Sequence, residues 1–304
     1  MDLNRASVFV KVVEEGGFTA AARALGLPKS SVSRSVALFE EELGVLLLQR
    51  STRKVELTEA GRQFYDGASR ALAGLEDARA AVSDLQGSLT GTVRVTAPED
   101  AGVWILGPIV TRFVERHPGV HVDLLLTGRV VDLAAEGVDF ALRAAKVTDA
   151  NLVARRLVPR DTGLFAAPRY LERHAAPTRP SELSSHECVI FRGDRQGRAQ
   201  WLISGPAGDE LVDVKGRITA DDFVFIHQAT ACGLGIGLMP KFLATQSVTR
   251  GELVPVLPAY QGFKGAWHLV YPSARYLPRR AVAFRDLVLA ELGVPASTPT
   301  TSDT

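Results

Sequence analysis

The feature that most constrains the fold is a change of pattern near residue 90 of this 304-residue chain. Residues 1–90 carry helical periodicities with almost no strand signal, whereas short apolar strands alternate with helices from Gly91 onward. A chain of this length is expected to form two or three domains. The pattern predicts an all-α N-terminal domain, followed by an α/β domain with a mainly parallel sheet and helices on both faces.

The N-terminal part is expected to contain three short helices, a basic loop and one long helix. The helices are predicted over residues 3–13, 19–25, 28–43 and 58–86, with Thr19 and Thr58 as N-caps and Pro28 in a first turn. Two short strands are expected at 46–49 and 54–57. In the long helix the apolar positions alternate at spacings of three and four, which is typical of pairing with another helix: Ala68, Ala71, Leu75, Ala78, Val82 and Leu85.

In the second part, the strands are predicted at 93–97, 120–126, 140–143, 162–166, 187–191, 236–239 and 267–271, and the helices at 103–116, 131–136 and 278–292. The residues from Pro295 to the end are small and polar, so a disordered tail is expected over 295–304.

The second and third helices, joined by a turn at Gly26, have the pattern of a helix-turn-helix. In that motif the first turns of the second helix enter the major groove of double-stranded DNA. Those turns carry small polar and basic residues that can contact phosphates and base edges: Lys29, Ser30, Ser31, Ser33 and Arg34. Serine-rich helix starts and basic loops are also common on solvated surfaces, and the pattern alone leaves that alternative open.

The distribution of charge favours the DNA-binding interpretation. The net charge of +1 would argue against a nucleic-acid partner if charge were spread evenly. However, residues 16–39 hold basic side chains and no acid, and residues 44–55 hold Arg50, Arg53 and Lys54, again with no acid. A basic hairpin one helix after a helix-turn-helix is where a winged helix makes its second phosphate contact. Thr19, at the start of the second helix, is a further candidate contact.

Specific motifs extend over nearly the whole chain. They are FTAAA in the second helix, S-x-V-S-R-S in the third, E-x-x-L-G at its end, R-x-x-R-x-x-x-L-T-x-A-G in the basic hairpin, and later GTVRVTAP, DLAAEGVDFALRA, LVARRL and GLGIGLMP. In these motifs the chain closely resembles the LysR-type transcriptional regulators. One departure is Leu48, where the family usually has Phe.

The resemblance implies DNA contacts by Ser31, Ser33 and Arg34, and wing contacts by Arg50 and Arg53. It implies a winged helix-turn-helix domain (1–58), a linker and dimerisation helix (59–88) and an effector-binding domain (91–294). That domain has two lobes like a periplasmic solute-binding protein, lobe 1 about 91–159 and 267–294 and lobe 2 about 160–266, with a small-molecule effector between them. It further implies homodimers that assemble to homotetramers, with RNA polymerase as a partner.

Ligands of such sheets bind beyond the C-terminal ends of the strands. The candidate effector contacts are Pro98, Glu99, Asp100, Thr127, Arg129, Arg143, Lys146, Trp201, Asp221 and Asp222. The family often has a Ser or Thr near the first helix N-terminus that holds an effector carboxylate. Here Glu99 and Asp100 occupy that region and would repel an anion, although Arg129, Arg143 and Lys146 can restore a positive pocket. The alternative is that these residues are helix caps and surface charges.

Other classes of function lack a sequence signal. There is no G-x-S-x-G, G-x-x-x-x-G-K or H-E-x-x-H motif, so no enzyme activity, cofactor or metal is expected. A metabolite-binding module or enzyme with an N-terminal oligomerisation arm remains one alternative. A thiol redox switch at Cys188 and Cys232 is another. With no signal peptide and no run of about 18 apolar residues, a cytoplasmic protein without membrane association is expected.

Overall fold

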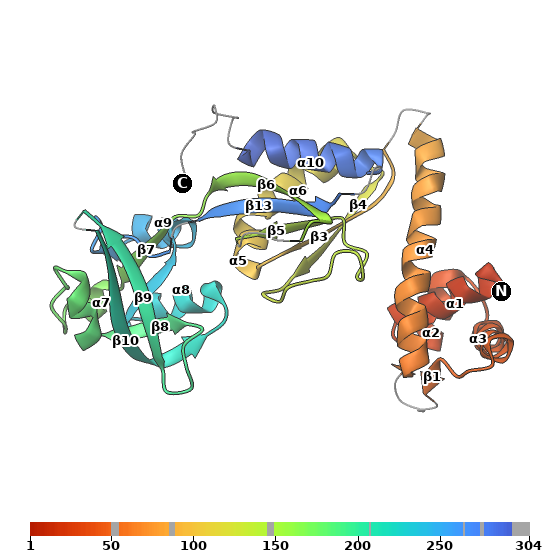
Figure 1. The fold of residues 1–304 in the computed structure, drawn as a ribbon, viewed down its shortest axis with the longest axis horizontal. Coiled ribbons are helices and arrows are strands. Elements are labelled where there is room, and N and C mark those ends of the chain that lie inside the picture. The colour runs from red at the N-terminus through yellow and green to blue at the C-terminus, as the bar shows by residue number, and fades with distance from the viewer. Residues whose placement is uncertain are drawn as a thin grey trace. The chain divides into compact units, whose positions relative to one another are not determined.

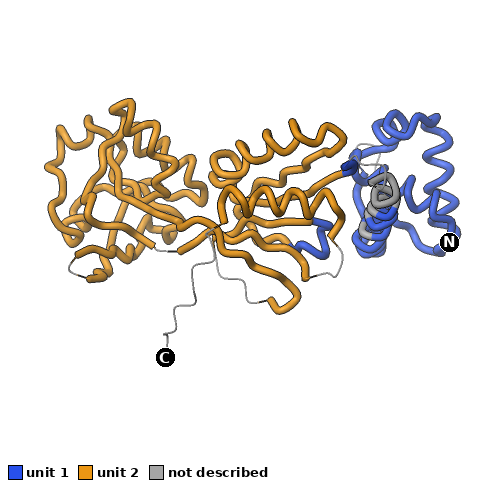
Figure 2. Tube along the Cα trace, turned by 90° about the horizontal axis from the view of Figure 1, so that it is seen from above, with its two compact units in different colours: residues 1–91, 132–138 blue, residues 92–131, 139–304 orange. Residues whose placement is uncertain are grey.

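The computed structural model describes residues 1–49, 55–84, 89–144, 149–206, 208–263, 265–273 and 277–293. The chain divides into two compact units, residues 1–91 with 132–138 and residues 92–131 with 139–304 (Figure 2). The predicted tail, 295–304, lies outside the described residues.

The described residues of the N-terminal unit form four helices and a two-stranded hairpin (Figure 1). The elements are α1 (Leu3–Glu14), α2 (Phe18–Leu25), α3 (Lys29–Leu43), β1 (Leu48–Gln49), β2 (Glu56–Leu57) and α4 (Glu59–Asp84). The hairpin is antiparallel, with Leu48 opposite Leu57. Two details differ from prediction. Gly17 is the N-cap of α2, so Thr19 lies within its first turn and caps nothing, and Pro28 is the N-cap of α3.

Three phenylalanines form the centre of the helical core. The rings of Phe9 in α1, Phe39 in α3 and Phe64 in α4 have centroids 5.1 to 6.4 Å apart, two of the three pairs edge to face. Gly26 and Gly44 end α2 and α3 in the left-handed conformation, with φ of 64° and 69°. The packing of this core and the glycines that end α2 and α3 determine which face of α3 is turned to solvent.

The first part of the second unit, here called lobe 1 (residues 92–131, 139–159 and 266–293), is built on a five-stranded sheet of order β4-β3-β5-β13-β6. Its strands are β3 (Gly91–Ala97), β4 (Val120–Leu126), β5 (Phe140–Arg143), β6 (Leu152–Pro159) and β13 (Ala266–Pro272). A helical segment follows β3, as α5 (Glu99–Ala101), a π-helical turn (Gly102–Leu106) and α6 (Gly107–Arg116). This segment packs beside α10 (Arg279–Leu292) through Phe113 and Phe284, whose centroids lie 5.1 Å apart (Figure 1).

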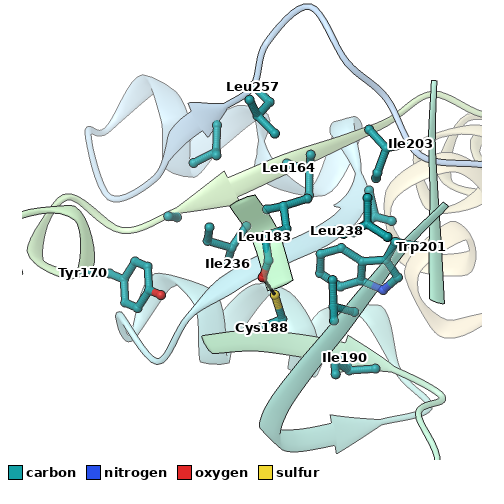
Figure 3. Packing of buried hydrophobic residues seen from close by; sticks show 14 residues of the cluster. Leu164, Tyr170, Leu183, Cys188, Ile190, Trp201, Ile203, Ile236, Leu238 and Leu257 are labelled. Carbon is teal, nitrogen blue, oxygen red and sulfur yellow. Dashed lines mark hydrogen bonds between the residues drawn. The ribbon is translucent and has the colours of Figure 1, made fainter. Parts of the chain in front are cut away.

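The second part, lobe 2 (residues 160–265), is built on a six-stranded sheet of order β12-β7-β11-β8-β10-β9. Its elements are β7 (Thr162–Ala166), α7 (Pro168–Leu171), a 3-10 turn (Pro180–Ser185), β8 (Glu187–Phe191), β9 (Arg198–Gly205), β10 (Gly208–Ala220), α8 (Phe223–Ala231), β11 (Ile236–Pro240), α9 (Lys241–Thr249) and β12 (Val254–Val256). Alternate residues of β8 belong to two separate hydrophobic clusters, Cys188 and Ile190 to one (Figure 3) and Val189 to the other.

The prediction of mainly parallel sheets was wrong. Strand β3 is parallel to β5, but β13 is antiparallel to both β5 and β6. The reason is that the chain leaves lobe 1 through β6 and returns through β13, and these two strands pair with each other. In lobe 2, β8 has parallel partners whereas the β9–β10 hairpin, which was not predicted, is antiparallel.

The predicted helix over 131–136 is instead a hydrogen-bonded turn. The Asp132 side chain accepts a hydrogen bond from the Ala135 amide, 3.0 Å away, and Gly137 adopts a φ of 63°. A side chain that satisfies a backbone amide, followed at once by a left-handed glycine, ends the segment before a helix can extend.

Candidate nucleic-acid interface and ligand site

The packing of α3 presents one polar and basic face to solvent. Val32, Val36 and Phe39 are buried against the other helices, at the spacing of one helix face. The opposite face is exposed and carries the predicted contacts Lys29, Ser30, Ser31, Ser33 and Arg34. Among the described residues, none of these five side chains forms a hydrogen bond or an ion pair, so their donors are available to a partner. Thr19, in α2, is exposed as well.

The basic hairpin is tied to α3 by a carboxylate that sequence reasoning did not single out. Oε1 of Glu40 accepts hydrogen bonds from the backbone amides of Leu47 and Leu48, at 2.7 and 3.0 Å. Both leucine side chains are buried. Glu40 therefore joins the end of α3 to the first strand of the hairpin. Arg50, Arg53 and Lys54, the predicted wing contacts, lie outside the described residues.

The base of the same hairpin is tied to α4. The Thr58 hydroxyl donates to the Leu46 carbonyl at 2.7 Å and accepts from the Gly61 amide at 2.9 Å, which confirms the predicted N-cap of α4. A β-carbon at Gly61 would overlap the carbonyl oxygen of Leu47. Only glycine lets α4 approach the hairpin this closely, which gives a physical reason for glycine at this point of the motif.

In the second unit, Asp100 is the most deeply buried of the predicted effector contacts. It is 3% exposed, at the start of the helical segment after β3, and its Oδ2 has no hydrogen-bond partner in the described structure. Burial raises the pKa of this carboxyl, and the nearby Asp222 and Glu99 raise it further, whereas the Arg160 guanidinium opposes the shift. Asp100 is thus a buried acid with an unused acceptor.

Arg160 lies where the chain crosses from lobe 1 to lobe 2, and it was not among the predicted contacts. Its guanidinium carbon lies 4.3 Å from the ring centroid of Phe263, 5.5 Å from that of Phe223 and 5.4 Å from that of Trp267, so rings from both lobes surround it. Its backbone amide donates to the Gly265 carbonyl on the returning segment, at 3.0 Å. The Nε is buried without a hydrogen-bond partner among the described residues.

Arg192, at the end of β8, links the two lobes directly. It adopts a left-handed φ of 51°, which is unfavourable for a non-glycine residue, and its Nη2 donates to the Gly128 carbonyl of lobe 1 at 3.3 Å. The preceding Phe191 stacks on Phe223, with centroids 3.9 Å apart and planes at 7°. We call Asp100, Arg160, Arg192 and the rings of Phe191, Phe223, Phe263 and Trp267 the lobe junction.

Several predicted contacts come together beside this junction. Pro98 and Glu99 begin the same helical segment as Asp100, and Asp222 caps α8, accepting from the Phe225 amide at 2.7 Å. The segment α5 contacts α8. The amide of Thr127 bonds the Ala97 carbonyl, which holds the end of β4 against the end of β3.

Of the remaining predicted contacts, one lies in the hydrophobic core of lobe 2. Trp201 is the clear correction, because it is 6% exposed in the core cluster with Cys188 and Leu164 (Figure 3). Phe223 belongs to the other cluster, together with Val189 of β8. The Trp201 ring fills the core instead of facing a ligand. Arg129 and Asp221 are exposed, Arg143 is half-buried in β5, and Lys146 lies outside the described residues.

Sequence reasoning missed Arg160, Arg192 and the rings of Phe191, Phe263 and Trp267. No motif marks them, since each becomes part of a site only through residues from distant segments. The one signal was local: both arginines directly follow a strand, where ligand-binding residues of α/β folds gather.

The two cysteines differ in their exposure. Burial raises the pKa of the Cys188 thiol to about 12, whereas Cys232 is exposed, and both are free thiols. Over the described ranges, no group of three or more His, Cys, Asp or Glu residues could hold a metal ion. No helix in that part of the chain is long and apolar enough to cross a membrane.

Comparison with known proteins agrees with this architecture. A family described as bacterial regulatory helix-turn-helix protein, lysR family, matches residues 3–62, and the LysR substrate binding domain matches residues 86–293. An HTH-type transcriptional regulator of Xanthomonas campestris pv. campestris is 35% identical over 298 residues, covering 97% of this chain and 87% of its own length.

Two full-length structures are also similar. The Vibrio cholerae virulence activator AphB is 28% identical with a TM-score of 0.65, covering 95% of this chain and 99% of its own. CrgA of Neisseria meningitidis, a LysR-type transcriptional regulator, is 30% identical with a TM-score of 0.61, covering 97% of this chain and 100% of its own. The chain therefore belongs to the LysR family of DNA-binding transcriptional regulators that are controlled by a small-molecule effector.

Proposed function

We propose that the exposed face of α3 reads the operator in the major groove. The observation that carries this proposal is the set of unpaired polar and basic side chains opposite the buried Val32 and Val36. Arg34 contacts a guanine edge, and the serines and Lys29 contact bases or phosphates: Ser30, Ser31 and Ser33. Thr19, Arg50, Arg53 and Lys54 contact the phosphate backbone beside them.

The protein acts as a dimer, and two dimers form a tetramer on DNA. Residues 1–58 form the DNA-binding domain and residues 59–88 the linker, in which α4 leaves Ala71, Leu75 and Ala78 exposed. A leucine that is 55% exposed on a helix with a 3-4 apolar spacing supports pairing with the same helix of a second chain. Two winged helices then bind half-sites about one helical turn apart. RNA polymerase is the downstream partner, and the protein acts in the cytoplasm, where its DNA lies.

The effector binds at the lobe junction, between the two lobes of residues 91–294. The buried Asp100 and the half-buried Arg160, each with a buried polar atom that has no hydrogen-bond partner in the described structure, support this position. Because the same junction holds both crossing segments, a ligand there alters how the lobes meet, and that change is the signal passed to the DNA-binding domain.

DNA binding is tested by fluorescence anisotropy with a fragment of the gene's own upstream region. Loss of one bidentate base contact removes about 1–3 kcal/mol of discrimination, so Arg34→Ala should weaken specific binding by roughly fivefold to more than a hundredfold. Arg53→Ala should weaken binding to every sequence and make the salt dependence less steep by about one phosphate contact.

Arg195→Ala is the matched control. It removes the same charge from an exposed turn of lobe 2 and should leave affinity unchanged. If Arg34→Ala and Arg53→Ala behave like this control, the DNA-binding surface is assigned to the wrong residues.

A further inference from the structure

Two buried polar atoms of opposite type lie unused at the lobe junction. Oδ2 of Asp100 can only accept when the carboxyl is ionised, and Nε of Arg160 can only donate, yet neither has a hydrogen-bond partner in the described structure. Buried polar groups in folded proteins nearly always have a partner, and each exception calls for an explanation. Two such exceptions among the described residues lie at the lobe junction, in a domain whose family binds a small molecule.

The two side chains belong to one electrostatic environment. The positive charge of Arg160 acts on Asp100, and the negative charge of Asp100 acts on Arg160. They do not pair directly, because the described ion pairs include neither of them and both atoms stay unused. Both atoms are therefore left for a ligand group to bond.

The walls of the junction are aromatic. The Arg160 guanidinium lies over the rings of Phe223, Phe263 and Trp267, and Phe191 stacks on Phe223. Such surfaces bind flat, apolar bodies through their faces and edges. Trp267 belongs to lobe 1 and is buried, whereas the half-buried Phe191 and Phe263 belong to lobe 2 and are the rings that a ligand can meet.

The charges around the junction disfavour an anion. Glu99 from the same helical segment and Asp222 from α8 both act on Asp100 with negative charge. The positive charges at the junction are those of Arg160, whose guanidinium is surrounded by rings, and of Arg192, which already donates to the Gly128 carbonyl. A carboxylate would meet the buried Asp100 without being able to donate to it, and an ammonium group would leave the Arg160 Nε unused.

We propose that the effector is a neutral aromatic compound whose hydroxyl group donates to Oδ2 of Asp100 and accepts from Nε of Arg160. This inference rests on the proposed function, because it places the effector at the lobe junction. A hydroxyl group is the smallest group that both donates and accepts, and a phenol remains neutral at pH 7. The ligand enters when the lobes part at the Arg192–Gly128 contact, and its ring then packs against Phe263.

Four compounds with the same ring separate the possible ligand chemistries. Phenol donates and accepts, anisole only accepts, benzoate is an anion, and benzylamine is a cation that only donates. Binding to the full-length protein at pH 7 is measured by titration calorimetry and by the rise in Tm that a ligand of the folded state produces. Phenol should bind at least tenfold more tightly than each of the other three. Benzoate or benzylamine binding as tightly as phenol, or none of the four binding, would overturn the inference.

The variant Asp100→Asn locates the binding. It keeps the size of the side chain but removes the charge that strengthens the hydrogen bond, so phenol affinity should fall at least tenfold. Unchanged phenol affinity would mean binding elsewhere, for example in the cavity of about 390 Å³ in lobe 2 between Lys241, Thr245 and Tyr260, and would refute the inference. Far-UV circular dichroism shows whether the variant folds. If it does not, the four-compound series on the unmodified protein still decides whether the inferred ligand chemistry is right.

DNA binding by the unmodified protein and by Arg34→Ala is measured in the same buffer. If the phenol tests fail while Arg34→Ala still loses DNA affinity, the ligand class is wrong and the DNA-binding proposal stands. If Arg34→Ala binds DNA normally, the proposed DNA interface fails whatever the ligand series shows.

Discussion

Replacing Glu40 by alanine should loosen the hairpin without unfolding the helical core. Glu40 holds two backbone amides, at 2.7 and 3.0 Å, and the side chains of both residues, Leu47 and Leu48, are buried. A hydrogen bond to a charged group contributes about 1.5–3 kcal/mol. Because the two bonds share one oxygen and water replaces part of them, we expect the local opening free energy to fall by about 3 kcal/mol.

That loss corresponds to roughly hundredfold faster hydrogen exchange at the two amides, since about 1.4 kcal/mol changes an equilibrium tenfold. Hydrogen–deuterium exchange with mass spectrometry on the full-length protein can follow a peptide that contains Leu47 and Leu48. Peptides from α1 should keep their protection, which distinguishes local opening from unfolding of the domain. Glu40→Gln, which retains an acceptor, should give an intermediate rate.

Glu41→Ala is the matched control, because it removes the neighbouring carboxylate from the same helix and Glu41 is exposed. Its exchange should equal that of the unmodified protein. If Glu40→Ala and Glu41→Ala exchange at the same rate in the hairpin, the Glu40 carboxylate does not hold the hairpin and the reasoning is refuted.

Three further predictions concern particular contacts. Gly61→Ala should lower the Tm and weaken DNA binding, because its β-carbon would meet the Leu47 carbonyl; unchanged values would contradict this. Burial lowers the pKa of His227 below its ordinary value, so the unfolded chain binds the proton more readily. Stability should therefore be complete above about pH 6.5 and fall as the pH drops below it, and Tm measured against pH should change less in His227→Gln. A thiol reagent should label Cys232 in the folded protein and Cys188, whose pKa burial raises to about 12, only after denaturation; equal labelling rates would reopen the redox alternative.

The DNA-binding face could be predicted because its causes are local. Val32, Val36 and Phe39 follow the period of one helix face, and this spacing alone assigns Ser33 and Arg34 to the opposite face. The glycine stops and the Thr58 cap are likewise properties of a few consecutive residues. Thr19 was misplaced because Thr is a good cap in general, whereas here the N-cap of α2 is two residues earlier, at Gly17.

The ligand site could be predicted only in part, because its causes are distant in sequence. The end of the first strand was the right place to look, and it supplied Asp100. The burial of Asp100, and its proximity to Arg160, arise from segments that meet only when both lobes are formed. Trp201 shows the converse error, since a large aromatic residue with no assigned role was taken for a contact although its burial makes it part of the core.

A nearly neutral chain can still present a basic surface, and the contacts of its acids explain how. In the N-terminal unit, Glu14 and Glu15 both pair with Lys11, at 3.2 and 3.0 Å. Glu42 pairs with the N-terminal ammonium at 2.9 Å, and Glu40 accepts from two backbone amides. These carboxylates already have partners in the protein, whereas the basic side chains at the start of α3 have no partner among the described residues. Formal charge counts both groups equally, but a DNA phosphate approaching α3 meets chiefly the unpaired cations.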